Sequence, residues 1–74
     1  DEDSFTIYPN PASDFITIEI LNALESDVVI YDLTGKIIIR KFLHSGDNKI
    51  DVRNINSGIY VISINGLKSK LIIQ

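Results

Sequence analysis

Hydrophobic and polar residues alternate along much of the 74-residue chain. The alternation is clearest where Ile16, Ile18 and Ile20 fall on one face of an extended segment and polar residues fall between them. A period of two is typical of strands with one buried face, and no apolar repeat of the helical kind persists over a useful length. Fifteen residues are isoleucine, whose β-branched side chain favours strands over helices. The pattern predicts an all-β fold.

Seven strand-like segments recur about every ten residues, separated by turn-forming residues. They span 5–8, 15–21, 27–33, 36–44, 49–52, 58–64 and 67–73. The third contains a continuous apolar run from Val28 to Tyr31, which is typical of a strand covered on both faces. We expect a loop at 22–26 and a turn at 45–47. Short strands spaced in this way predict an Ig-like antiparallel β-sandwich, with a small closed barrel as the alternative.

Proline and glycine punctuate these segments. Pro9 and Pro11 fix φ and lack a backbone donor, so we expect them to shape the exit of the first strand rigidly. Gly35 can adopt a positive φ, which suits a three-residue hairpin loop that ends in a bulge. The dipeptide Asn65-Gly66 is the strongest two-residue hairpin signal in the chain.

Tyr60 comes early in the sixth predicted strand, just after a corner. In sandwich domains a tyrosine at this place often turns its hydroxyl back to the backbone a few residues upstream. Asn56 lies at about the right sequence distance for that bond. We therefore predict a structural role for Tyr60, with Gly58 giving the corner backbone freedom.

Length and composition bound the domain organisation. The chain is long enough for one small domain, which we place at 5–74, with residues 1–4 as the remnant of a solvated linker. It has no methionine, so we expect a piece of a longer protein. It has no cysteine, which excludes disulfides and thiol nucleophiles. A domain of this size needs nearly all its aliphatic side chains for the core, which leaves little room for a deep active site.

Few residues are suited to chemistry. The single histidine, His44, has Ser45 and Asp47 within the same predicted turn, where the three side chains point apart instead of converging as a triad does. We expect an exposed histidine and no enzyme. No spacing matches a calcium loop or a phosphate loop, so no metal or cofactor is expected. The net charge of −3 disfavours nucleic acid as a partner. No apolar run approaches the ~18 residues of a transmembrane segment.

Charge is divided unevenly along the chain. Residues 1–35 hold eight acidic side chains and no basic one, whereas residues 36–74 hold all seven lysines and arginines with two acids. One interpretation is charge pairing between neighbouring strands. The other is a basic strip that orients the domain on an acidic partner. The members of that strip are Lys36, Arg40, Lys41, Lys68 and Lys70.

Several segments together resemble a known family. They are Tyr-Pro-Asn-Pro-Ala-Ser-Asp at 8–14, the apolar run 28–31, Asp-Leu-Thr-Gly-Lys at 32–36, Ser-Gly-Ile-Tyr-Val-Ile at 57–62 and Lys-Leu-Ile-Ile-Gln at 70–74. Their order and spacing resemble the type A C-terminal sorting domain of the type IX (Por) secretion system. Ile55 stands where the family often has leucine.

The resemblance implies an Ig-like β-sandwich that closes the C-terminus of proteins exported by bacteria of the Bacteroidota. It implies an attached upstream cargo domain, the type IX machinery with its outer-membrane shuttle protein, and a sortase-like peptidase that often removes the domain. It implies passage through the periplasm, then the outer-membrane surface or the extracellular space. The alternative is an accessory sandwich that binds carbohydrate or protein at the cell surface.

We expect the last strand to carry recognition. A terminal strand at a sheet edge presents unpaired N–H and C=O groups that a partner can extend, and Lys68 and Lys70 are the kind of charges that guard such an edge. The predicted recognition residues are Lys70, Leu71, Ile72, Ile73 and Gln74. The residues expected to maintain shape are Pro9, Asn10, Pro11, Gly35, Gly58 and Tyr60.

Overall fold

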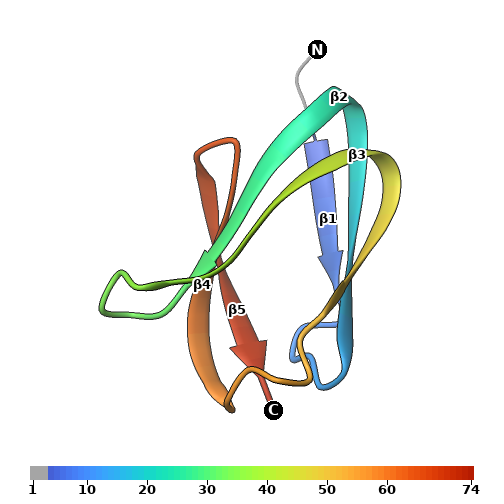
Figure 1. Ribbon diagram of the computed structural model, residues 1–74. Helices are drawn as coiled ribbons and strands as arrows, with labels where there is room; N and C mark the ends of the chain where they lie inside the picture. Colours follow the sequence, from blue (N-terminus) through green and yellow to red (C-terminus); the bar gives the residue numbers. More distant parts are fainter. Residues whose placement is uncertain (1–3) are drawn as a thin grey trace.

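The computed structural model describes residues 4–74 and consists of strands, turns and loops. The strands are β1 (Ser4–Tyr8), β2 (Phe15–Tyr31), β3 (Ile37–Asp51), β4 (Gly58–Ile64) and β5 (Leu67–Ile73), shown in Figure 1. No helix occurs within residues 4–74, and so none there is long and apolar enough to cross a membrane. The prediction of an all-β fold is confirmed. Of the predicted linker remnant, residues 1–3 lie outside the described part, and Ser4 is the first residue of β1.

All strands pair antiparallel, in the order β1-β2-β4-β5 with β3 also on β2. The first part of β2 pairs with β1 and with the end of β3, whereas its last part pairs with the start of β3 and with β4. The long strands β2 and β3 therefore run through both halves of the sheet, which curls over on itself (Figure 1). The two halves are the layers of the predicted Ig-like sandwich.

The core lies between these two layers. Ile16, Ile18 and Ile20 from one half of β2, and Val28 and Ile30 from the other, are at most 2% exposed. They are joined in one buried cluster by side chains from β3, β4, β5 and the loops. Burial of this apolar surface is the main force that holds so small a domain together. The alternation read from the sequence thus identifies the buried face correctly.

The predicted breaks at 22–26 and 45–47 do not separate strands, because β2 and β3 each continue through them. Their pairing register shifts between Ile20 and Glu25, where the sheet bends. Gly46 has a φ of 98°, and the Asn48 side-chain amide donates to the carbonyls of His44 and Gly46 at 2.7 and 3.2 Å. Between the pairs on either side of this shift, β2 has four residues where β3 has one, so the strands bulge and bend here and the chain does not reverse.

Two turns follow the sequence prediction closely. In the turn 32–36, Gly35 has a φ of 93° and donates its N–H to the Asp32 carbonyl at 3.0 Å. At the tip of the β4–β5 hairpin, Asn65 and Gly66 both have positive φ, 51° and 87°. Positive φ at both positions is the two-residue turn that matches strand twist.

The run 28–31 differs from its prediction. Val28 and Ile30 face the core at 0% exposure, but Val29 and Tyr31 on the outer face are half-buried. The outer face of this part of β2 is therefore not covered by a second layer. The apolar run reflects a central strand with neighbours β3 and β4 on either side.

Candidate functional site: the clasped terminal strand

The terminal strand β5 divides its side chains between core and surface. Leu71 and Ile73 are 0% and 2% exposed and belong to the buried cluster. Lys70 and Gln74 are exposed, and Ile72 is half-buried. In the folded domain, only the side chains of Lys70, Ile72 and Gln74 in the predicted recognition segment can meet a partner.

The outer edge of β5 is covered by the segment that follows β1. The Asn10 side-chain amide donates from Nδ2 to the Lys70 carbonyl at 3.0 Å and accepts at Oδ1 from the Ile72 N–H at 3.0 Å. This side chain therefore copies the donor and acceptor of a peptide group in a neighbouring strand. Both X-Pro bonds that flank Asn10, at Pro9 and Pro11, are cis.

Ala12 continues the same pairing toward the C-terminus. Its N–H donates to the Ile72 carbonyl at 2.8 Å, and its carbonyl accepts from the Gln74 N–H at 2.7 Å, as a parallel bridge to Ile73. Ala12 is 0% exposed, so no larger side chain fits there without a shift. We call Asn10 and Ala12 together the clasp.

The edge of β5 is paired over its C-terminal part, because the clasp satisfies the outward backbone groups from the Lys70 carbonyl to the Gln74 N–H. The sequence placed Asn10 among residues that maintain shape, but it gave no sign that this asparagine contacts β5. The segment is about 60 residues away along the chain, and a Pro-Asn-Pro turn does not specify which edge it meets.

Tyr60 makes the predicted corner bond. Its Oη donates to the Asn56 carbonyl at 2.6 Å, and the residue is 8% exposed. Gly58 has a φ of 158°, and a Cβ placed there would stand 3.6 Å from Tyr60 Cε1. The hydroxyl ties the loop that precedes β4 to the core, which fixes where β4 and hence β5 begin to pair.

We expect Tyr60→Phe to lower the free energy of unfolding by about 1 kcal/mol, because it removes one hydrogen bond and leaves the ring packed. Tyr31→Phe is the matched control, since the Tyr31 hydroxyl has no hydrogen-bond partner in the described part of the chain. Urea unfolding followed by circular dichroism measures both. Equal effects of the two substitutions would show that the Tyr60 hydroxyl bond does not stabilise the folded domain.

The structure places the members of the predicted basic strip on β3, on β5 and in the turn 32–36. Arg40 lies on β3 and is bound to Asp27 of β2, with Nη2–Oδ2 at 3.1 Å. Lys41 is the next residue and points to the opposite face of the strand. Lys68 lies on β5, which β2 and β4 separate from β3, and Lys36 lies in the turn 32–36. The Arg40–Asp27 pair is instead the cross-strand charge pairing of the alternative interpretation.

A second ion pair forms within one corner. The Arg53 guanidinium donates to both carboxylate oxygens of Asp51, at 3.1 and 2.8 Å. The hydrogen bonds from the Arg53 side chain and then its backbone lower the pKa of Asp51 from 3.8 to about 2. A carboxyl whose folded pKa is depressed stabilises the folded state above its unfolded pKa and loses that contribution as pH falls.

We therefore expect Asp51→Asn to reduce stability at neutral pH, with the difference shrinking as pH falls from 3.8 through about 2 and vanishing below that. The difference is small because the pair is exposed and solvent screens it. Thermal unfolding midpoints of the two proteins across this range measure it. A gap that stays constant with pH would contradict this assignment.

The remaining chemical candidates are dispersed. His44 is exposed on β3 opposite Glu25, and β3 continues through the turn predicted at 45–47. Within residues 4–74, no three side chains of His, Cys, Asp or Glu are grouped so as to hold a metal ion. The protein is thus a small antiparallel β-sandwich in which the clasp pairs with the outer edge of the terminal strand.

Comparison with known proteins gives the family. Residues 6–74 match the model of the secretion system C-terminal sorting domain, and the chain belongs to this family. Such a domain is a C-terminal sorting signal of the type IX secretion system, as the sequence resemblance predicted. No solved structure is significantly similar to the chain.

Three curated proteins from two bacteria are similar to the chain. Beta-agarase A of Zobellia galactanivorans is 34% identical over 70 residues, which are 92% of this chain. Beta-agarase D of the same organism is 39% identical over 61 residues, or 78% of the chain. Ulvan lyase NLR42 of Nonlabens ulvanivorans is 32% identical over 69 residues, or 92%. The chain spans only 11–13% of the length of these relatives.

Proposed function

We propose that residues 5–74 act as a non-catalytic sorting signal that directs an attached upstream cargo through the type IX machinery and across the outer membrane. The observation that carries this proposal is the family match over 6–74, which extends over β2–β5 and the last three residues of β1. Since the similar curated proteins are named as agarases and a lyase, we propose that the cargo is likewise a secreted enzyme.

The recognition surface that we propose combines β5 with the clasp. Lys70, Ile72 and Gln74 supply the accessible side chains of the segment 70–74, and Asn10, also exposed, lies against the same edge. A receptor cannot add a strand along 70–74, because the clasp occupies those backbone groups. It reads side chains and shape, so recognition requires the domain to be folded.

The route follows from this role. The cargo and its sorting domain pass through the periplasm in the folded state, and an outer-membrane shuttle protein binds them there. A sortase-like peptidase then cuts between the cargo and the sorting domain at the surface, which leaves the cargo attached to the outer membrane or released. No catalytic group of this domain takes part, because the cutting residues belong to the peptidase.

A reporter fusion tests the proposal. A fluorescent protein with an N-terminal Sec signal is joined to residues 1–74 and expressed in a host that carries the type IX machinery, with an otherwise identical host that lacks it as control. We expect the reporter at the cell surface only when the machinery is present. Periplasmic retention in both hosts, together with measurable glycan affinity, would contradict sorting and favour the carbohydrate-binding alternative.

The mass of the surface reporter tests the peptidase step. In a host with an active sortase-like peptidase, we expect a reporter shortened by about the size of the sorting domain. In a host whose peptidase is inactivated, we expect the uncut fusion. Mass spectrometry of the purified reporter distinguishes them. An uncut surface reporter in the host with the active peptidase would contradict removal of the domain while leaving sorting intact.

A further inference from the structure

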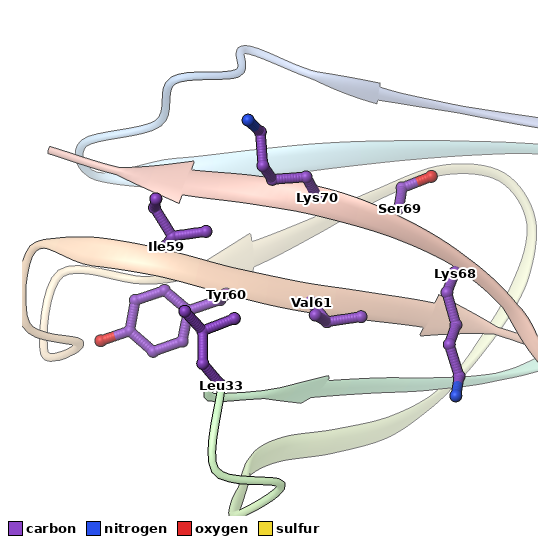
Figure 2. Close-up of a pocket in the computed structure, with 7 residues that line it drawn as sticks. All are labelled: Leu33, Ile59, Tyr60, Val61, Lys68, Ser69 and Lys70. Atoms are coloured by element: carbon purple, nitrogen blue, oxygen red, sulfur yellow. The ribbon is translucent and has the colours of Figure 1, made fainter.

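A shallow groove of about 370 Å³ lies on the outer face of the layer that contains β4 and β5. It is lined by residues of the turn 32–36, β4 and β5: Leu33, Ile59, Tyr60, Val61, Lys68, Ser69 and Lys70. Figure 2 shows Leu33, Ile59 and Val61 along the outer side of β4, with Lys68 leaning across β4 toward β2. The groove is therefore apolar along its length, with the Lys68 ammonium group at one end and the Lys70 side chain directed away from it across β5 (Figure 2).

Two of the apolar side chains that line the groove are exposed, so burial in the core does not explain their presence. Leu33 is 69% exposed and Ile59 is 48% exposed. The turn that carries Leu33 is held by Asp32, whose Oδ1 accepts hydrogen bonds from the backbone N–H and hydroxyl of Thr34 at 2.9 and 2.6 Å. The side chain of Leu33 takes no part in this turn. Exposed apolar side chains that gather in one hollow mark interaction sites more often than those scattered singly do.

The charged lining has one sign. Both charged side chains of the groove, Lys68 and Lys70, are lysines, and neither has a carboxylate within 4.0 Å in residues 4–74. Lys68 Nζ instead lies 5.9 Å from the centre of the Tyr31 ring, which holds it over the sheet. Arg40 and Arg53, by contrast, are each neutralised by an aspartate. These two lysines are therefore available to bind a negatively charged partner.

We propose that this groove binds an extended acidic segment of a partner protein. An apolar side chain of that segment lies between Leu33, Ile59 and Val61, and a neighbouring carboxylate meets Lys68. A second copy of this chain does not fit as the occupant, since two such faces would bring lysines against lysines. The hollow along β4 suits a side chain more closely than it suits the flat surface of a lipid bilayer.

The groove adjoins the proposed recognition surface, since Lys70 belongs to both, but its occupant is tested by binding alone and so separately from sorting. The ¹⁵N-labelled chain is titrated with the capped peptide Gly-Asp-Leu-Ile-Asp-Gly and with Gly-Lys-Leu-Ile-Lys-Gly, each followed by NMR. We expect the acidic peptide to shift the amide signals of Leu33, Ile59, Val61 and Lys68, and the basic peptide to shift none of them.

Variants locate the site. We expect Lys68→Glu and Leu33→Ser each to weaken binding of the acidic peptide by about tenfold, the scale of one lost charge contact or one lost buried side chain. Lys41→Glu and Leu67→Ser are the matched controls, since both residues are exposed and lie outside the groove. The spectra also show that each variant is folded.

Three results would overturn the proposal. The first is equal binding of the two peptides, and the second is an effect of the controls as large as that of Lys68→Glu and Leu33→Ser. The third is shifts at these amides with phosphatidylglycerol vesicles but none with the acidic peptide, which would assign the face to membranes.

Discussion

Deletion of residues 71–74 is expected to unfold the domain. It removes Leu71 and Ile73, which are 0% and 2% exposed in the core, and it also removes the Gln74 N–H that bonds to Ala12. Loss of one buried leucine or isoleucine side chain costs about 2–5 kcal/mol. A domain of this length has about 4–11 kcal/mol of stability in total, so two such losses exhaust it.

Circular dichroism and the dispersion of the NMR spectrum measure this result. Lys70→Ala is the matched control, because its side chain is exposed and surface substitutions usually change stability by about 0.5 kcal/mol or less. A truncated chain that still unfolds cooperatively near the midpoint of the full chain would contradict the placement of β5 in the core. Terminal deletion therefore cannot separate recognition from folding, and only exposed positions can.

Replacement of Asn10 by alanine is expected to open the edge of β5. The substitution removes the bonds to the Lys70 carbonyl and the Ile72 N–H, at about 0.5–1.5 kcal/mol each, so we expect a loss of about 1–3 kcal/mol. The Ile72 amide is the local reporter of the clasp. Its hydrogen exchange is expected to accelerate about tenfold or more, because its bonded partner is gone.

Two further variants make this experiment specific. Asn10→Asp keeps an acceptor for the Ile72 N–H but faces the Lys70 carbonyl with a second oxygen, so we expect it to be destabilised as well. Asn54→Ala is the matched control, since Asn54 is exposed and makes no side-chain hydrogen bond within residues 4–74. Unchanged exchange of the Ile72 amide in Asn10→Ala would show that the clasp does not close this edge.

The sequence predicts those features of the fold that depend on local chemistry. The alternation at Ile16, Ile18 and Ile20 identifies the buried face, because the side-chain period of a strand is fixed. The Asn65-Gly66 turn follows from the ease with which these residues adopt positive φ. The Tyr60 corner bond follows from its place after the loop.

The features that the sequence misses depend on contacts between distant residues. A glycine and polar residues at 45–47 look the same whether the chain reverses or bends, and only the register of β3 against β2 shows that it bends. Arg40 and Lys41 are successive residues of β3 and point to opposite faces, and Lys68 lies on β5, which β2 and β4 separate from β3. The contact of Asn10 with Lys70 and Ile72 joins opposite ends of the chain.

Export machinery, we propose, recognises the exposed side chains of the terminal segment only while the domain around it is folded. In the reporter fusion, the triple substitution Lys70→Glu, Ile72→Ser and Gln74→Ala alters that surface and leaves Leu71 and Ile73 in the core. Lys49→Glu, on β3 and exposed, is the matched control. The measurement is the fraction of reporter at the cell surface, taken beside the NMR spectrum of each isolated domain. We predict a folded triple variant that stays in the periplasm and a control that is exported normally. A folded triple variant that reaches the surface as well as the unaltered domain does would contradict the claim.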